Sequence, residues 1–268
     1  MASIILLVVS YFFDAKAWHT VCTSTAPSIA FKTCFTSVGL SVFNKYVPGK
    51  VWALASRSNY LHTKTGHSLT DLSIATVFSQ LVAIWSALAI VIAVGGESSP
   101  NIYWDAAILV AFVATSIAVF LLFGKRLSLS HKVKACAWYS LHWLFVALAF
   151  YVLLLSTGGQ ELKYGVGLMY VAATIMGIVA IFAPGGLGIR EGTLVFLLAS
   201  HGYSTVEASS IAVGSRIWAH VAEACMFCIG LIFARKQPAD LLPRQEIERE
   251  STRGTSSDSP SPPKIPGM

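Results

Sequence analysis

Charged residues are scarce in this 268-residue chain: Asp, Glu, Lys and Arg together make up 12%, about half the share usual in soluble domains. Hydrophobic residues make up 55%, and the mean hydropathy is +0.66. They lie in long blocks rather than at amphipathic spacing. One soluble core of this size cannot hide so many apolar runs of near-membrane length. The sequence therefore predicts an all-α, polytopic transmembrane bundle.

Recognisable catalytic groups are also lacking. The sequence shows no Ser/His/Asp set, no paired carboxylates and no spacing of metal ligands. Cys225 and Cys228 form a C-x-x-C pattern in the last apolar segment, without a second pair or a His cluster, which favours buried, inert thiols. Gly186, Gly188 and Gly192 have the wrong spacing for a dinucleotide fingerprint. We expect neither an enzyme nor a bound metal or cofactor, although a membrane-embedded lipid transferase with an unrecognised active site stays open.

The apolar blocks predict about seven or eight spans, some broken by Pro and Gly or re-entrant. The candidate spans are 2–21, 26–46, 70–94, 104–123, 135–157, 164–183, 189–201 and 206–234. Four of them are long enough to cross about 30 Å of hydrocarbon unaided, namely 70–94, 104–123, 135–157 and 206–234. Segment 189–201 is short enough to be a half-helix, and Asp14 interrupts the first span.

Basic residues predict the orientation. They gather in loops 47–69 and 124–134, whereas the loops between carry few charges. Positive loops face the cytoplasm, so eight crossings leave both termini cytoplasmic in a bacterial inner membrane. Residues 235–268 are rich in Pro, Ser and charge and are predicted to form a disordered cytoplasmic tail, which leaves 1–234 as the transmembrane domain.

The most informative segment is Pro-Gly-Gly-Leu-Gly-Ile-Arg-Glu-Gly at 184–192, a break between two apolar runs. Proline and glycine there interrupt helical backbone, at Pro184, Gly185, Gly186 and Gly188. Irregular backbone at membrane depth is tolerated only where protein or a watery cavity satisfies it. The helix that follows offers an anion-attracting N-terminus, so Arg190 is a candidate ligand for an anion and Glu191 suits the first turn. The alternative is a tight cytoplasmic turn with Arg190 as a topology marker.

A second polar set lies in the last span. Arg216, His220 and Glu223 are spaced i, i+4, i+7 and share one helical face. A charge at the centre of a membrane helix costs about 2.5–3.5 kcal/mol even on the lenient insertion scale. We expect either a structural ion pair facing the bundle or a polar stripe facing a headgroup site that includes Arg190.

The first half carries a similar break, in which Pro48, Gly49 and Lys50 follow an apolar segment and precede Arg57. Paired Pro/Gly breaks in two halves are typical of transporters with internal repeats and a central site. Inverted repeats should open towards opposite faces, but simple counting puts both breaks on the cytoplasmic side. Either one segment is re-entrant or the repeat is illusory. The alternative for 46–64 is an interfacial amphipathic stretch.

The Pro184–Gly192 motif, with an apolar run and Arg216 after it, resembles the lysylphosphatidylglycerol synthase transmembrane-region family of flippase-like proteins. The Tyr46–Trp52 segment is similar to that family's first-half motif. The resemblance implies a helical bundle that binds or moves lipids, without the soluble domain needed for synthase activity. It implies a translocase for an anionic phospholipid, an aminoacyl-phospholipid or a lipid-linked glycan, with Arg190 and Arg216 on the phosphate. The alternative is a non-transporting partner or anchor of an envelope-glycan enzyme.

Overall fold

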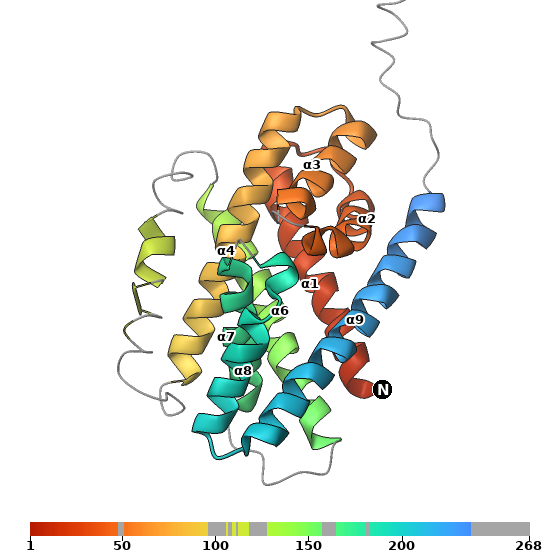
Figure 1. Ribbon diagram of the computed structural model, residues 1–268. Helices are drawn as coiled ribbons and strands as arrows, with labels where there is room; N and C mark the ends of the chain where they lie inside the picture. The colour runs from red at the N-terminus through yellow and green to blue at the C-terminus, as the bar shows by residue number, and fades with distance from the viewer. Residues whose placement is uncertain are drawn as a thin grey trace, which may run out of the picture.

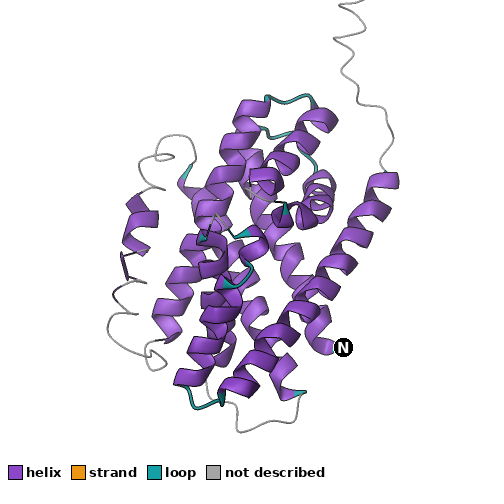
Figure 2. Ribbon diagram, viewed as in Figure 1, coloured by secondary structure: helices purple, strands orange, loops and turns teal. Residues whose placement is uncertain are grey.

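The computed structural model describes residues 1–47, 51–95, 106, 109–110, 112–117, 128–156, 165–180 and 183–236, and over these residues it contains helices and no strand (Figures 1 and 2). The predicted all-α class is therefore confirmed. The elements are α1 (Ala2–Thr25), α2 (Phe31–Ser41), η1 (Val42–Tyr46), α3 (Val51–Thr65), α4 (Leu69–Gly95), α6 (Leu129–Leu155), α7 (Val166–Val179), η2 (Pro184–Gly186), α8 (Ile189–Ser200) and α9 (Thr205–Arg235).

Within the described part of the chain, four helices are long and apolar enough to cross a membrane, namely Ala2–Thr25, Leu69–Ala93, Leu129–Leu155 and Thr205–Arg235. They contain the predicted spans 2–21, 70–94, 135–157 and 206–234 or most of their length. The predicted span 104–123 lies largely outside the described residues, as does the predicted tail beyond residue 236. Helix α1 packs along α6, and α9 crosses α1 and α2. A Cβ on Gly39 of α2 would lie 3.0 Å from the Cα of Gly230 on α9, so glycine permits this close helix contact.

Residues 26–46 do not form the single span that the sequence predicts. Helix α2 has 11 residues and the 3-10 helix η1 has 5, which together reach about 27 Å at 1.5 and 2.0 Å per residue, short of the hydrocarbon core of about 30 Å. The chain then turns back through α3. Ser28, before α2, hydrogen-bonds His67, after α3, with 3.0 Å between Oγ and Nε2, so both outer ends lie together. Helices α2 and α3 therefore form a re-entrant hairpin, here called the first hairpin.

Residues 164–183 and 189–201 likewise form a hairpin rather than two spans. Helix α7 has 14 residues and α8 has 12, again too short to cross alone. Gly185, Gly186 and Gly188 all have positive φ, at 58°, 72° and 80°. A Cβ on Gly186 would lie 2.8 Å from the Cα of Gly177, so only glycine allows the break to pack on α7. We call α7, η2 and α8 the second hairpin.

The two hairpins enter the bundle from opposite ends. In Figure 1 the first hairpin opens at the upper end and the second at the lower end, and Figure 2 shows loop segments interrupting the helices partway through the bundle. At their inner ends η1 contacts η2, and η1 also contacts α9. This arrangement removes the objection that both breaks lie on one side, which arose from counting α2, α7 and α8 as full crossings and the segment of α3 as a loop.

The same geometry places the start of α1 and the end of α9 at opposite ends of the bundle (Figure 1). Met1 lies at the lower end of the bundle, whereas Arg235, the last residue of α9, lies at the upper end (Figure 1). The expectation that both termini are cytoplasmic counted three limbs, α2, α7 and α8, as full crossings, although each turns back inside the bundle; the side of the membrane on which each terminus lies stays a prediction.

The predicted burial of the Cys225 and Cys228 thiols is wrong. Cys22 and Cys34 are buried and Cys136 is half-buried, but Cys225 and Cys228 are exposed on α9. They lie on a different face of that helix from Glu223, which is buried against the bundle.

Candidate functional site

The inner ends of the two hairpins meet around the ring of Tyr46. The Tyr46 ring stacks on His220 of α9, with centroids 5.0 Å apart and 21° between the planes. Gly185 of η2 also packs on the Tyr46 ring, because a Cβ added to Gly185 would overlap the ring atoms Cδ1 and Cε1. The positive φ and the missing side chain of Gly185 therefore both serve one purpose, which is to let η2 approach η1.

Glu223 on α9 ties the first hairpin to the bundle. The Lys45 Nζ lies 2.6 Å from Glu223 Oε1, and the Tyr46 hydroxyl donates to Oε2 at 2.8 Å. The Tyr11 hydroxyl of α1 lies 3.5 Å from Oε1. Glu223 is 2% exposed, a burial that requires charge partners of this kind. The predicted polar face of α9 thus points into the bundle.

Glu191 ties the second hairpin to the same helix. One of its carboxylate oxygens pairs with the Arg216 guanidinium, and the other accepts the Gly188 backbone N–H at 2.8 Å. That second bond satisfies a free N–H at the start of α8, as in a capping box. The predicted place of Glu191 in the first helical turn is confirmed, but its ion-pair partner is Arg216 and not Arg190.

Arg190 is held by an aromatic residue. Its guanidinium donates to the Tyr170 hydroxyl and lies 4.7 Å from the centroid of the Tyr170 ring. Among the residues described, no carboxylate lies within ion-pair distance of Arg190. The site contains three cations, Lys45, Arg190 and Arg216, and two carboxylates, Glu191 and Glu223. The site therefore carries one positive charge more than its own acids balance, and that excess favours an anionic ligand.

The second hairpin lies within the part of the chain that matches a known protein family. Residues 123–222 match the family described as the lysylphosphatidylglycerol synthase TM region. The resemblance predicted from the sequence is confirmed over that range. Among curated proteins and solved structures, no match was found. The family match includes Arg190, Glu191 and Arg216 and ends one residue before Glu223, so the first hairpin lies outside it.

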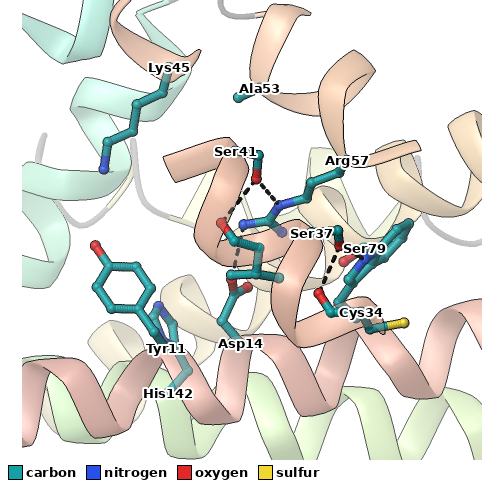
Figure 3. Close-up of polar contacts among 12 residues, drawn as sticks. Tyr11, Asp14, Cys34, Ser37, Ser41, Lys45, Ala53, Arg57, Ser79 and His142 are labelled. Carbon is teal, nitrogen blue, oxygen red and sulfur yellow. Dashed lines mark hydrogen bonds and ion pairs between the residues drawn. The ribbon is translucent and has the colours of Figure 1, made fainter. Parts of the chain in front are cut away.

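Arg57 does not join this site. Its guanidinium Nη2 lies 3.0 Å from Asp14 Oδ2 on α1, and its Nε lies 3.2 Å from Ser41 Oγ on α2. Figure 3 shows this cluster with Asp14 and Arg57 facing one another below Ser41. Arg57 therefore stabilises the first hairpin against α1. Pro48, Gly49 and Lys50, the other predicted ligands of the first half, lie outside the described residues.

Sequence reasoning missed four polar residues of these clusters, which are Tyr11, Asp14, Lys45 and Tyr170. All four lie in or beside apolar segments, where a polar group needs a partner. Asp14 and Lys45 were the readable signals, because charges in such segments rarely face lipid. Their partners, Arg57 and Glu223, are 43 and 178 residues away, and no local pattern links them.

Proposed function

We propose that this chain is a translocase for a lipid with an anionic headgroup, such as an anionic phospholipid, an aminoacyl-phospholipid or a lipid-linked glycan. One observation carries the proposal: the inner ends of two oppositely entering hairpins meet at a cluster with an unbalanced positive charge at Arg190. Paired breaks at mid-membrane are where transporters place their substrate sites. The proposal assigns no catalytic step to the chain.

The start of α8 supports an anion at this position. Helix N-termini attract anions through free N–H groups and the helix dipole. The Glu191 carboxylate occupies that position and bonds the Gly188 N–H, while its other oxygen pairs with Arg216. A phosphate that binds Arg190 and shares the Arg216 guanidinium with Glu191 makes the same kind of contact, so these residues suit an anionic headgroup.

The test is lipid movement in vesicles. Purified protein is reconstituted with fluorescent phosphatidylglycerol, and movement between leaflets is followed by chemical quenching of the outer leaflet. We expect Arg190→Ala to abolish movement without unfolding the protein, because it removes the unbalanced charge and leaves no acid unpaired. Arg235→Ala, at the end of α9, is the matched control and should move lipid like the unchanged chain. Equal movement by the Arg190 variant would contradict the proposal.

The membrane orientation is part of the proposal. The end of α3, the start of α6 and the end of α9 carry Lys64, Lys132 and Arg235, and Figure 1 places these three points at the upper end of the bundle. The positive-inside rule puts that end in the cytoplasm of a bacterial inner membrane, with Met1 at the outer face. Labelling of a cysteine introduced at Lys64 from the outside of intact cells would contradict it.

The second candidate is a non-transporting partner of an envelope-glycan enzyme. The observation in its favour is that Glu191 and Glu223 both have cations of their own, as in a static bundle. Such a protein moves no lipid in the vesicle assay and keeps its partner when Arg190 is replaced. Native mass spectrometry of the purified protein distinguishes the two by showing a bound anionic lipid or a bound protein.

A further inference from the structure

Glu223 has a feature that headgroup binding leaves unexplained. It is a carboxylic acid in the middle of a 31-residue apolar helix, 2% exposed and in ion-pair contact with Lys45. Its three neighbours, Lys45, Tyr46 and Tyr11, all present donors to its two oxygens. This donor shell stabilises the ionised form, and two of its three members, Lys45 and Tyr46, belong to η1 at the inner end of the first hairpin.

The groups that face Glu223 from the remaining elements do not replace Lys45. Arg216 is committed to Glu191, and Arg190 to Tyr170 of α7. His220, one turn before Glu223, donates its Nδ1 hydrogen to the Arg216 carbonyl at 2.6 Å and stacks on Tyr46. Helix α2 directs Lys32 towards Phe233 instead. Within the described residues, Lys45 is the one cation in ion-pair contact with Glu223.

An anion that enters the site competes with Glu223 for Lys45. The Lys45 side chain is 37% exposed whereas Glu223 is 2% exposed, so the lysine is the partner that can be reached. A phosphate that takes Lys45 leaves a buried carboxylate without a cation, which costs several kcal/mol. Binding a proton removes that charge and most of its cost.

We propose that Glu223 is a proton-binding group coupled to the anionic lipid: the headgroup displaces it from Lys45, and the carboxylate takes up one proton. The proton comes from water and forms an O–H bond on Glu223; it returns to water when the headgroup leaves and the Lys45–Glu223 pair re-forms. This inference rests on the proposed translocase function and adds its coupling ion.

The coupling also distinguishes the two hairpins. Protonation weakens the contacts of Lys45 and Tyr46 with α9, so the inner end of the first hairpin is released. The second hairpin keeps its tie, because the Glu191–Arg216 pair does not involve Glu223. Proton binding therefore frees one hairpin while the other stays anchored, which is a difference that a translocation cycle requires.

The experiment measures lipid binding and proton uptake together. The full chain is placed in nanodiscs of phosphatidylcholine, fluorescent phosphatidylglycerol is added, and a pH-indicator dye in weak buffer follows the protons. We expect uptake of about one proton per lipid bound, and an affinity that rises by up to about tenfold per pH unit as pH falls from 8 to 6, since one linked proton sets that limit.

Glu223→Gln imitates the protonated acid and should bind the lipid tightly, with no proton uptake and little dependence on pH. Glu207→Gln, an identical change at an exposed position of the same helix, should behave like the unchanged chain. His220→Gln should keep proton uptake, because the imidazole does not contact Lys45. If that variant loses the uptake instead, the proton belongs to His220 and the proposal fails.

Lys45→Met gives an independent check if Glu223→Gln does not fold. Without its cation Glu223 should already be protonated, so lipid binding should release or take up no proton. Saturable binding without proton uptake in the unchanged chain overturns the coupling and leaves the translocase proposal standing. Absence of saturable phosphatidylglycerol binding overturns both.

Discussion

The two hairpins use the same backbone device with opposite charge arrangements. The first hairpin contributes cations to ion pairs with helices outside it: Lys45 pairs with Glu223 on α9, and Arg57 pairs with Asp14 on α1. The second hairpin contributes an acid instead, since its Glu191 pairs with Arg216 on α9. Its own cation, Arg190, stays on Tyr170 within the hairpin.

That difference separates anchoring from binding. A cation that is paired with an acid on a long helix holds a limb in place, and a ligand must compete with that acid to reach it. Arg190 is not paired in that way, so it is the charge most available to an anion. The first hairpin is thus held by its charges, whereas the second presents one.

Glycine contacts differ between the hairpins as well, and they give the largest expected effect. The first hairpin packs on α9 through Gly39 and Gly230, and the second closes on itself through Gly177 and Gly186. We expect Gly186→Ala to lower stability by about 4 kcal/mol, the sum of a strained positive φ and an overpacked contact. The measurement is thermal unfolding in detergent.

Gly192→Ala is the control for that variant. Gly192 lies in α8, where an added Cβ would meet no atom of a neighbouring element within 4 Å, and alanine favours a helix over glycine by about 1 kcal/mol. We expect unchanged or slightly raised stability. If Gly186→Ala unfolds at the same temperature as Gly192→Ala, the second hairpin does not depend on the close contact between η2 and α7.

Removing one arginine from each hairpin tests the contrast in charge. Arg57→Met leaves Asp14 half-buried without its cation, and we expect a loss of about 3 kcal/mol in stability. Arg190→Met leaves no ion-paired acid behind, so its loss should be smaller while lipid movement is abolished. The measurements are thermal unfolding and the vesicle assay. Equal destabilisation by both variants would remove the distinction between an anchoring and a presenting hairpin.

The sequence predicted the parts of this contrast that are local. Pro184, the glycines after it and the charges of α9 are readable because a break or a charge in an apolar run is anomalous wherever it folds. The identity of each ion pair is not readable in the same way. Glu191 lies next to Arg190 in sequence and yet pairs with Arg216, because the first turn of α8 directs the two neighbours to different sides.

The fold was predictable to the same extent. Apolar runs identified all four of the long helices, and three of the runs meet the membrane requirement by length alone. Segments such as 26–46 are long and apolar too, but whether they cross or turn back depends on where their ends meet. The Ser28–His67 contact, which shows that the chain turns back, joins residues 39 positions apart. A hydropathy pattern cannot predict such a contact.

Tyr170→Phe sharpens the contrast with the smallest change. The phenylalanine keeps the ring under the guanidinium and the stack on Phe150, whose centroid lies 4.5 Å away, and removes only the hydroxyl that binds Arg190. We expect stability to fall by about 1 kcal/mol, because one hydrogen bond is lost. Arg190 then has one partner fewer, so phosphatidylglycerol should bind at least as tightly as before, as a titration in nanodiscs would measure. Weaker binding would mean that the hydroxyl itself contacts the headgroup, and that the second hairpin presents a pair of donors rather than a single charge.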